Sequence, residues 1–216
     1  MGFLTSAHLV FLFNGLLWTV ALSVIAFIGG GLLGFVVAIA RLYGPRWSRT
    51  LVSLYIKLIQ GLPLLVLLPL AYFGLPSLGI DVKPLTAAGL ALSIYVSAYL
   101  GEIWRGCIES VPKTQFEAAE CLALHWHQRL LHVILPQAMK IATPPTVGFM
   151  VQIVKNTSLA SAIGFVELAR AGQIINNSTF EPFIIFVIVA IMYFALCYPL
   201  SVLSRRLEER FNVAHR

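Results

Sequence analysis

Polar residues that could carry chemistry are concentrated in one stretch, QFEAAECLALHWHQRLLHVILPQA, at residues 115–138. It contains two glutamates, three histidines and an arginine, and imidazole and carboxylate groups can ligate zinc or transfer protons. However, His125 and His127 fall on different faces of a helix, and no acidic residue has ligand spacing to them. We therefore expect no metal site. A helix that links two membrane spans and a helix that docks a partner protein remain as alternatives.

A second polar cluster stands near the outer end of an apolar segment and consists of Gln152, Lys155, Asn156, Thr157 and Ser158. A lysine at the centre of a bilayer costs about 2.5–3.5 kcal/mol by insertion scales, and less near the interface. Lys155 therefore either extends its ammonium group to the outer membrane surface or faces the carboxylate of a substrate. In the second case Asn156, Thr157 and Ser158 would supply hydrogen bonds to that substrate.

Glu102 and Arg105 are three residues apart, which makes them neighbours on one face of a helix. They are either a gate latch or a solvated ion pair near the inner surface. No cluster of Asp, His, Ser or Cys has catalytic spacing within an apolar segment, so an enzyme is not expected. Cys107, Cys121 and Cys197 are isolated and have neither zinc-ligand spacing nor a disulfide framework.

The elements that must position these residues are membrane helices. The 216-residue chain is 59% hydrophobic and only 11% charged, and its mean hydropathy is +0.87. A span needs about 20 apolar residues, and five segments qualify: 16–40, 51–75, 85–107, 133–158 and 183–204. Pro63 and Pro69 predict a kink or an interruption in the second. Gly29-Gly30-Gly31 and Gly34 favour close helix packing in the first. The expected fold is an all-α polytopic membrane protein.

The basic residues predict the orientation of the five spans. Twelve of the 15 Lys and Arg residues lie after spans one and five or between spans three and four. Because positive residues are retained on the cytoplasmic side, we expect the N-terminus outside and the C-terminus in the cytoplasm. The net charge of +6 is then a topology signal, and a nucleic acid is not expected as a partner.

The longest inner segment is expected to form an amphipathic helix over 113–130. Pro112 ends the preceding helix because proline has no backbone N–H. Thr114 and Glu117 have the spacing of a capping box. Apolar residues then recur at three- and four-residue steps and form one stripe: Phe116, Ala119, Leu122 or Ala123, Trp126, Leu130 and Val133. The periodicity alone fits both a linker at the membrane surface and a docking helix.

This segment also carries a motif, formed by Glu117-Ala118-Ala119, Ala123 and Val133-Ile134-Leu135-Pro136. It resembles the loop of binding-protein-dependent ABC importer permeases, which reads Glu-Ala-Ala, three residues, Gly, nine residues, Ile, any residue, Leu-Pro. Every spacing agrees, while Ala123 replaces the glycine and Val133 the isoleucine. Other segments resemble the polar amino acid branch of these permeases: GLPLLVLL at 61–68, SAYLGEIWRGCIESVPKTQ at 97–115 and KNTSLASAIGFVELARAG at 155–172. Lys57 and Gln60 depart from that branch, which commonly has Glu and Arg there.

The resemblance implies that residues 1–216 form a single importer transmembrane domain with a coupling loop at about 108–136 and a coupling helix between spans three and four. In such importers the permease is half of a two-permease unit, whose second member is identical or a sister subunit. A cytoplasmic ATPase dimer binds ATP and Mg²⁺, and an extracytoplasmic binding protein delivers the substrate. The residues expected to couple the permease to the ATPase are Glu117, Ala118, Ala119, Ala123, Leu124, Leu135 and Pro136.

The chain has no G-x-x-x-x-G-K-[ST] phosphate loop, so we expect it to hold no cofactor and to hydrolyse no ATP itself. The expected location is the bacterial plasma (inner) membrane, as a multi-pass protein. Span four contains no acidic residue that could pair with a cationic side chain, which favours an acidic or neutral polar amino acid as substrate. A channel or secondary transporter is the rival function, but we find no inverted repeat of the kind those proteins usually carry.

Overall fold

The computed structural model describes residues 5–212, and every regular element in that range is helical. The α-helices are α1 (Ser6–Tyr43), α2 (Arg46–Gly61), α3 (Leu64–Ser77), α4 (Pro84–Glu109), α5 (Lys113–Cys121), α6 (Trp126–Gln128), α7 (Leu135–Asn156), α8 (Leu168–Thr179) and α9 (Pro182–Asn212). A π-helical segment, η1 (Arg129–Ile134), precedes α7, and a 3₁₀ segment, η2 (Thr157–Ile163), follows it.

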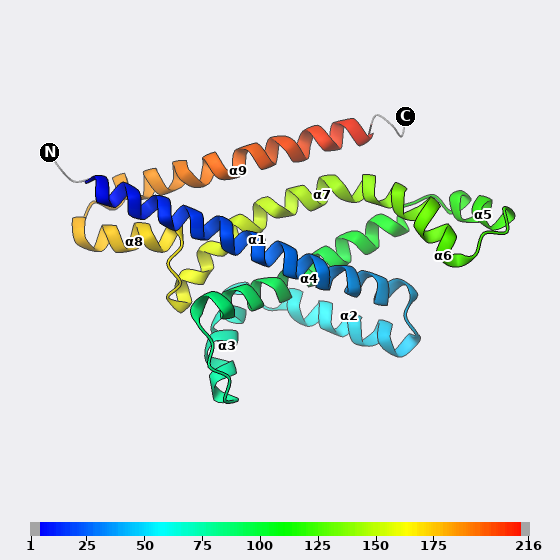
Figure 1. Cartoon of the computed structure of the whole chain (residues 1–216), viewed down its shortest axis with the longest axis horizontal. Coiled ribbons are helices and arrows are strands. Elements are labelled where there is room, and N and C mark those ends of the chain that lie inside the picture. Colours follow the sequence, from blue (N-terminus) through cyan, green and yellow to red (C-terminus); the bar gives the residue numbers. More distant parts are fainter. Residues whose placement is uncertain (1–4, 213–216) are drawn as a thin grey trace.

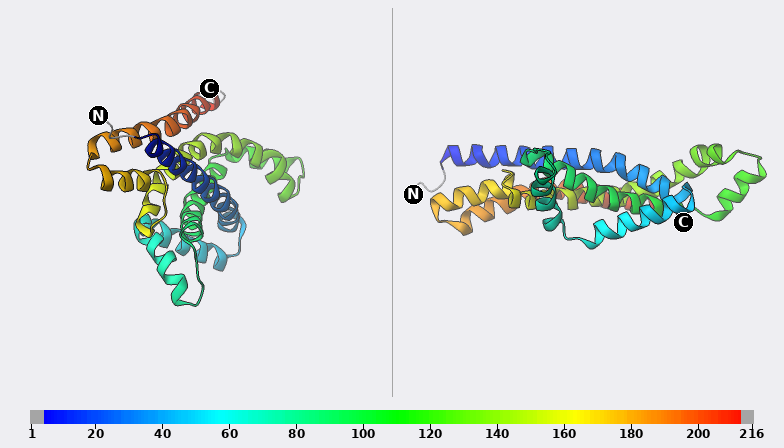
Figure 2. Two further views of the ribbon diagram at one scale, coloured as in Figure 1. Left: turned by 60° about the vertical axis from the view of Figure 1, so that its left-hand side comes forward. Right: turned by 90° about the horizontal axis from the view of Figure 1, so that it is seen from below.

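The helices form an elongated bundle with two distinct ends (Figure 1). α1, α7 and α9 run along its length, and α8 lies at the end where α1 begins. α5 and α6 lie at the opposite end, beyond the last turn of α1 and the first turn of α2, and Figure 2 shows the same separation from a second direction. α9 ends toward the α5–α6 side. The chain therefore keeps its longest polar loop and helix α8 at opposite ends.

Within residues 5–212, three helices are long and apolar enough to cross a membrane: α1, α4 and α9. They correspond to the expected spans 16–40, 85–107 and 183–204. The other two expected spans are bent pairs of helices, so the total is up to five if each pair is one span. α2 and α3 meet at 105°, and the helical run 126–163 meets α8 at 50°. The expected interruption at Pro63 is confirmed, because α2 ends at Gly61 and α3 begins at Leu64.

The largest core forms where α1 and α4 pack against each other. Its buried side chains are mostly Ala, Leu, Val and Ile, and α3 and η2 complete it. Glycines permit the approach. A Cβ on Gly30 would lie 2.4 Å from the Cβ of Val96, and a Cβ on Gly101 would lie 2.6 Å from Cγ1 of Val37. The close packing that the glycines of span one predicted is therefore confirmed.

Polar side chains join further helix pairs inside the bundle. The Trp104 indole N–H donates to the Thr146 hydroxyl at 2.9 Å and connects α4 to α7. The Tyr55 hydroxyl lies 2.6 Å from the Ser97 hydroxyl and connects α2 to α4. Gln60, where related permeases commonly have arginine, donates to the Ala98 carbonyl at 3.3 Å. Such hydrogen bonds contribute on average about 0.6 kcal/mol each in a membrane protein, so they orient the helices more than they stabilise them.

We expect Gly30→Ala to destabilise the protein by about 1–3 kcal/mol, because the new methyl group would overlap Val96 in a packed interface. Gly31→Ala is the matched control, since its nearest neighbour would be Trp104 at an ordinary 3.7 Å. Thermal unfolding of the two variants in detergent would measure the difference. Equal midpoints for both variants would contradict the interpretation of Gly30 as the point of closest approach.

Candidate functional site

The segment 113–130 is not one continuous helix, so that expectation is wrong. α5 ends at Cys121 and α6 begins at Trp126. Between them Ala123 has a φ of 55°. The Ala123 N–H donates to the Glu120 carbonyl at 2.9 Å, and the Leu124 N–H donates to the Ala119 carbonyl at 3.3 Å. These two bonds form a Schellman motif, whose left-handed position is usually glycine. This chain therefore forms the turn with Ala123, at the position where the Glu-Ala-Ala motif has glycine.

The capping box expected from Thr114 and Glu117 is also wrong. Pro112 is the N-cap of α5, and the cap forms no side-chain hydrogen bond. The helix consequently begins at Lys113, and Thr114 is already its second residue. A capping side chain must come from the residue before the first helical one, so Thr114 lies two positions too late to act as a cap.

Seven of the nine residues of α5 are exposed, and Phe116 and Ala119 are the two that are not. Four of the exposed residues lie at helical spacing and are called the docking face: Thr114, Glu117, Ala118 and Cys121. Ala119 is only 2% exposed. Its side chain therefore packs within the chain, which does not fit the expectation that it contacts a partner. Glu117 and Ala118 remain available to one, and so does the exposed Ala123.

The docking face is fixed to the membrane helices by a small core beneath it. Four buried residues form that core: Ile108, Val111, Ile134 and Ala138. Arg129 pairs with Glu120 at 3.2 Å and closes the loop on itself. Leu135 and Pro136 form the first turn of α7, where the missing N–H of proline is tolerated, and both are half-buried. Leu124 is half-buried as well. These three residues of the motif thus lie against the helices and outside the docking face.

The polar cluster at the far end of α7 divides into exposed and buried members. Gln152 and Lys155 are exposed, and the Gln152 side-chain amide donates to Asn156 Oδ1 at 3.1 Å. Thr157 is fully buried, and its hydroxyl donates to the Val154 carbonyl at 2.7 Å. Its expected role as a substrate contact does not fit this arrangement, because the hydroxyl is already bonded and enclosed.

The Ser158 hydroxyl is also hydrogen-bonded to the backbone, because it donates to the Lys155 carbonyl at 2.7 Å. Both hydroxyls thereby satisfy carbonyl groups where α7 changes to the 3₁₀ segment η2. Lys155 forms no ion pair with any residue in the range 5–212. The ammonium group of Lys155 is thus the one charge of this cluster that remains available to a ligand or to the membrane surface.

Glu102 and Arg105 form the expected pair, with Arg105 Nη2 at 2.5 Å from Glu102 Oε1. The pair is part of a larger network. Arg105 also bonds Glu109 at 2.5 Å, and Arg41 at the end of α1 lies 3.8 Å from Glu102. All four side chains are partly exposed, so each pair contributes little to stability by itself. The network connects α1 to α4 directly before the coupling loop. A gate role for the pair stays a prediction.

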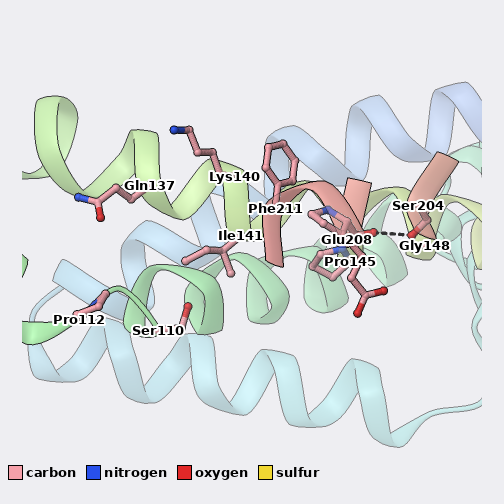
Figure 3. A pocket seen from close by; sticks show the side chains of 11 residues that line it. Ser110, Pro112, Gln137, Lys140, Ile141, Pro145, Gly148, Ser204, Glu208 and Phe211 are labelled. Carbon is pink, nitrogen blue, oxygen red and sulfur yellow. Dashed lines mark hydrogen bonds between the residues drawn. The ribbon is translucent and has the colours of Figure 1, made fainter. Parts of the chain in front are cut away.

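An open cavity of about 800 Å³ lies beside the coupling loop (Figure 3). It is lined from α7 by Gln137, Lys140, Ile141, Pro144, Pro145 and Gly148, from α9 by Ser204, Glu208 and Phe211, and from the α4–α5 turn by Ser110 and Pro112. At its edge the Ser204 hydroxyl donates to the Pro144 carbonyl at 2.9 Å and joins α9 to α7. The cavity lies between the first half of α7 and the last turns of α9.

Sequence reasoning missed the polar site at the start of α8. Glu167 is completely buried and caps α8 by accepting from the Ala169 and Arg170 N–H groups. The Tyr193 hydroxyl of α9 donates to the same carboxylate at 2.7 Å. An acidic residue directly before a helical stretch is an N-cap signal, and it could have located the cap. Nothing local in the sequence indicated Tyr193.

We expect Ala123→Gly to stabilise the coupling loop by roughly 1 kcal/mol, because glycine adopts a positive φ without the clash of a Cβ. The same substitution at Ala118, in the exposed interior of α5, should cost about 1 kcal/mol of helix stability. Hydrogen exchange of the amides of residues 118–124 would measure both effects. If the two variants changed protection in the same direction, the left-handed turn would be excluded.

Comparison with known proteins identifies the family. Residues 30–213 match the family described as "Binding-protein-dependent transport system inner membrane component". The chain is 33% identical over 201 residues to the probable amino-acid ABC transporter permease protein YckA of Bacillus subtilis, covering 93% of this chain and 89% of that one. It is 34% identical over 204 residues to the glutamine transport system permease protein GlnP of Escherichia coli, covering 94% and 93%.

The fold agrees with this assignment. A solved structure described as an amino acid ABC transporter with histidines superimposes with a TM-score of 0.87 at 34% identity, covering 93% of this chain and 94% of that one. The methionine ABC transporter MetNI superimposes with a TM-score of 0.78 at 16% identity, which shows a shared fold alone. The chain therefore belongs to the inner-membrane components of binding-protein-dependent ABC importers, in their polar amino acid branch, and is a membrane permease whose ATPase activity lies in separate subunits.

Proposed function

We propose that the chain is one half of the translocation unit of an ATP-driven amino acid importer in a bacterial plasma membrane. The observation that carries the proposal is the docking face of α5: a short exposed face of small and polar residues, fixed by its own core at the end of the bundle opposite α8. The N-terminus is outside and the C-terminus is cytoplasmic, which puts most basic residues inside.

The docking face binds a cytoplasmic ATPase dimer, whose subunits hold ATP and Mg²⁺. Ala118 permits close approach of the ATPase surface, and Glu117 pairs with a basic group on it. Because η1 and α7 continue from the coupling loop without a break in helical structure, a displacement of the loop is transmitted along α7. The other partners are a second permease, identical or a sister subunit, and an extracytoplasmic binding protein that delivers the amino acid.

Ala118→Trp tests the docking face, because a bulky residue there should prevent close approach while leaving the fold intact. An overpacked interface costs about 1–3 kcal/mol, so substrate-stimulated ATPase activity of the complex should fall by about tenfold or more. The same substitution at Ala162, an exposed alanine of η2 beyond the far end of α7, should leave ATPase binding unchanged. Full stimulated activity in the Ala118 variant would rule out α5 as the docking helix.

The substrate is an acidic or neutral polar amino acid. α7 has no acidic residue that could hold a cationic side chain, and the free ammonium group of Lys155 is suited to a substrate carboxylate. Relatives named for glutamine and for L-cystine transport support the neutral polar class. Gln152 and Asn156 are the remaining candidates for hydrogen bonds to the substrate.

Lys155→Gln should raise the KM for uptake by about 10- to 100-fold, because a hydrogen bond to a charged group contributes about 1.5–3 kcal/mol. Lys83→Gln, at the N-cap of α4, removes the same charge away from α7 and should leave KM unchanged. Uptake of radiolabelled glutamine into proteoliposomes would measure both, with competition by a panel of amino acids. An unchanged KM in the Lys155 variant would assign this lysine to the membrane surface, and strong competition by arginine or lysine would exclude the substrate class.

A further inference from the structure

The carboxylate of Glu167 is the centre of a buried polar site outside the coupling loop and the expected substrate path. It is 0% exposed and accepts the Ala169 and Arg170 N–H groups at 2.8 Å each and the Tyr193 hydroxyl at 2.7 Å. Within residues 5–212 it has no ion pair, and the Arg170 guanidinium bonds Gln173 instead. A buried acid without a cation is costly unless hydrogen bonds satisfy it, and here three donors and a helix N-terminus do so.

The remaining N–H group in the first turn of α8 is satisfied from α1. The Leu168 N–H donates to the Thr19 hydroxyl at 3.2 Å, and this hydroxyl donates to the Gly15 carbonyl at 3.1 Å. Thus α1 and the cap residue itself satisfy the first three amides of α8, and α9 donates to the cap residue. Free amides at a helix start normally bond water, so their bonding to side chains fixes the helix end in position.

Close backbone contacts on both sides of α8 support the same conclusion. A Cβ on Gly15 of α1 would lie 3.0 Å from the Cβ of Ala171, and a Cβ on Gly172 would lie 2.7 Å from Cγ2 of Val189 in α9. The first turns of α8, which Glu167 caps, therefore pack tightly between α1 and α9. A shift of α8 along α9 would break the bond between Tyr193 and the Glu167 carboxylate, and a shift along α1 would break the bond between the Leu168 N–H and Thr19.

Glu167 also stands at a particular point along the chain. A helical run leads from η1 through α7 to η2, and Glu167 follows four residues after η2 ends. Glu167 thus caps α8 at the far end of this run, and α8 lies at the end of the bundle opposite α5 and α6 (Figure 1). Beyond it, α8 exposes Asn177 and Ser178, and Ile174 is 38% exposed.

We propose that Glu167 is a positioning residue that holds α8 against α1 and α9, so that this end of the bundle keeps the shape that the substrate-loaded binding protein recognises. The inference rests on the proposed function for the identity of that partner. Glu167 itself contacts neither the partner nor the substrate. It acts through α8, and Tyr193 and Thr19 assist it.

Two variants test this anchor in the assembled transporter. Glu167→Gln replaces one acceptor oxygen by an amide that opposes the N–H groups of α8, and Tyr193→Phe removes one hydroxyl from the site. Tyr198→Phe is the matched control, because it deletes a hydroxyl from an exposed tyrosine of the same helix. If Glu167→Gln does not assemble, Tyr193→Phe still tests the anchor with a smaller change.

Both test variants should raise the concentration of loaded glutamine-binding protein that half-saturates ATPase stimulation, by about tenfold for a lost hydrogen bond to a charged group. Basal ATP hydrolysis and ATPase association should stay within about twofold of the unmodified complex, because the coupling loop is untouched. A purely structural role would instead lower the yield of complex and leave the half-saturating concentration unchanged. The proposal would be overturned if both test variants had the same half-saturating concentration of binding protein as Tyr198→Phe.

Hydrogen exchange at the amides of residues 168–170 gives a second readout that needs no binding protein. Exchange should be slow in the unmodified chain and at least about tenfold faster in both test variants. Equal protection in all variants would overturn the anchor even if the importer function holds. Conversely, faster exchange in a chain that neither binds an ATPase nor responds to any amino acid binding protein would confirm the anchor, refute the proposed function and remove the assigned role in partner recognition.

Discussion

The contact between α1 and α4 is the constraint on which the rest of the structure depends. In lipid there is no hydrophobic force between helices, so association relies on close packing and on hydrogen bonds across the interface. Gly30 and Gly101 have no space for a Cβ, since Val96 and Val37 occupy the places where one would lie. With these two helices side by side, α3 and η2 complete one core. Hydrogen bonds between side chains then join α2 and α7 to α4.

The same bundle keeps two different polar sites apart. At one end, the α5 docking face is small, exposed and supported by a separate core. At the other, the Glu167 carboxylate is enclosed and bonded by three donors. α7 and its π-helical and 3₁₀ extensions join the two ends in one helical run. The proposed function needs this division, because the ATPase would act on one membrane face and the substrate would arrive at the other.

Several features could be predicted from local sequence, and the failures have identifiable causes. The break at Pro63 was predictable because proline removes a donor wherever it stands. The amphipathic helix was extended too far because its apolar residues recur at helical steps past Ala123, and periodicity does not reveal that Ala123 adopts a positive φ. Thr157 and Ala119 were expected at contacts with substrate and ATPase. Their burial depends on neighbours distant in sequence, which no periodicity describes.

The sequence by itself determined the membrane location, the five apolar segments and the coupling motif, because hydrophobic length, proline and residue spacing act locally. The tertiary structure alone decided which side chains of those segments are available. In the folded chain Tyr193 is hydrogen-bonded to Glu167, 26 residues away, and Thr19 to Leu168, 149 residues away. Ala119 is buried, whereas the neighbouring Ala118 is exposed. Burial and hydrogen bonding are properties of surfaces brought together by packing, and adjacent residues of one helix can therefore have opposite roles.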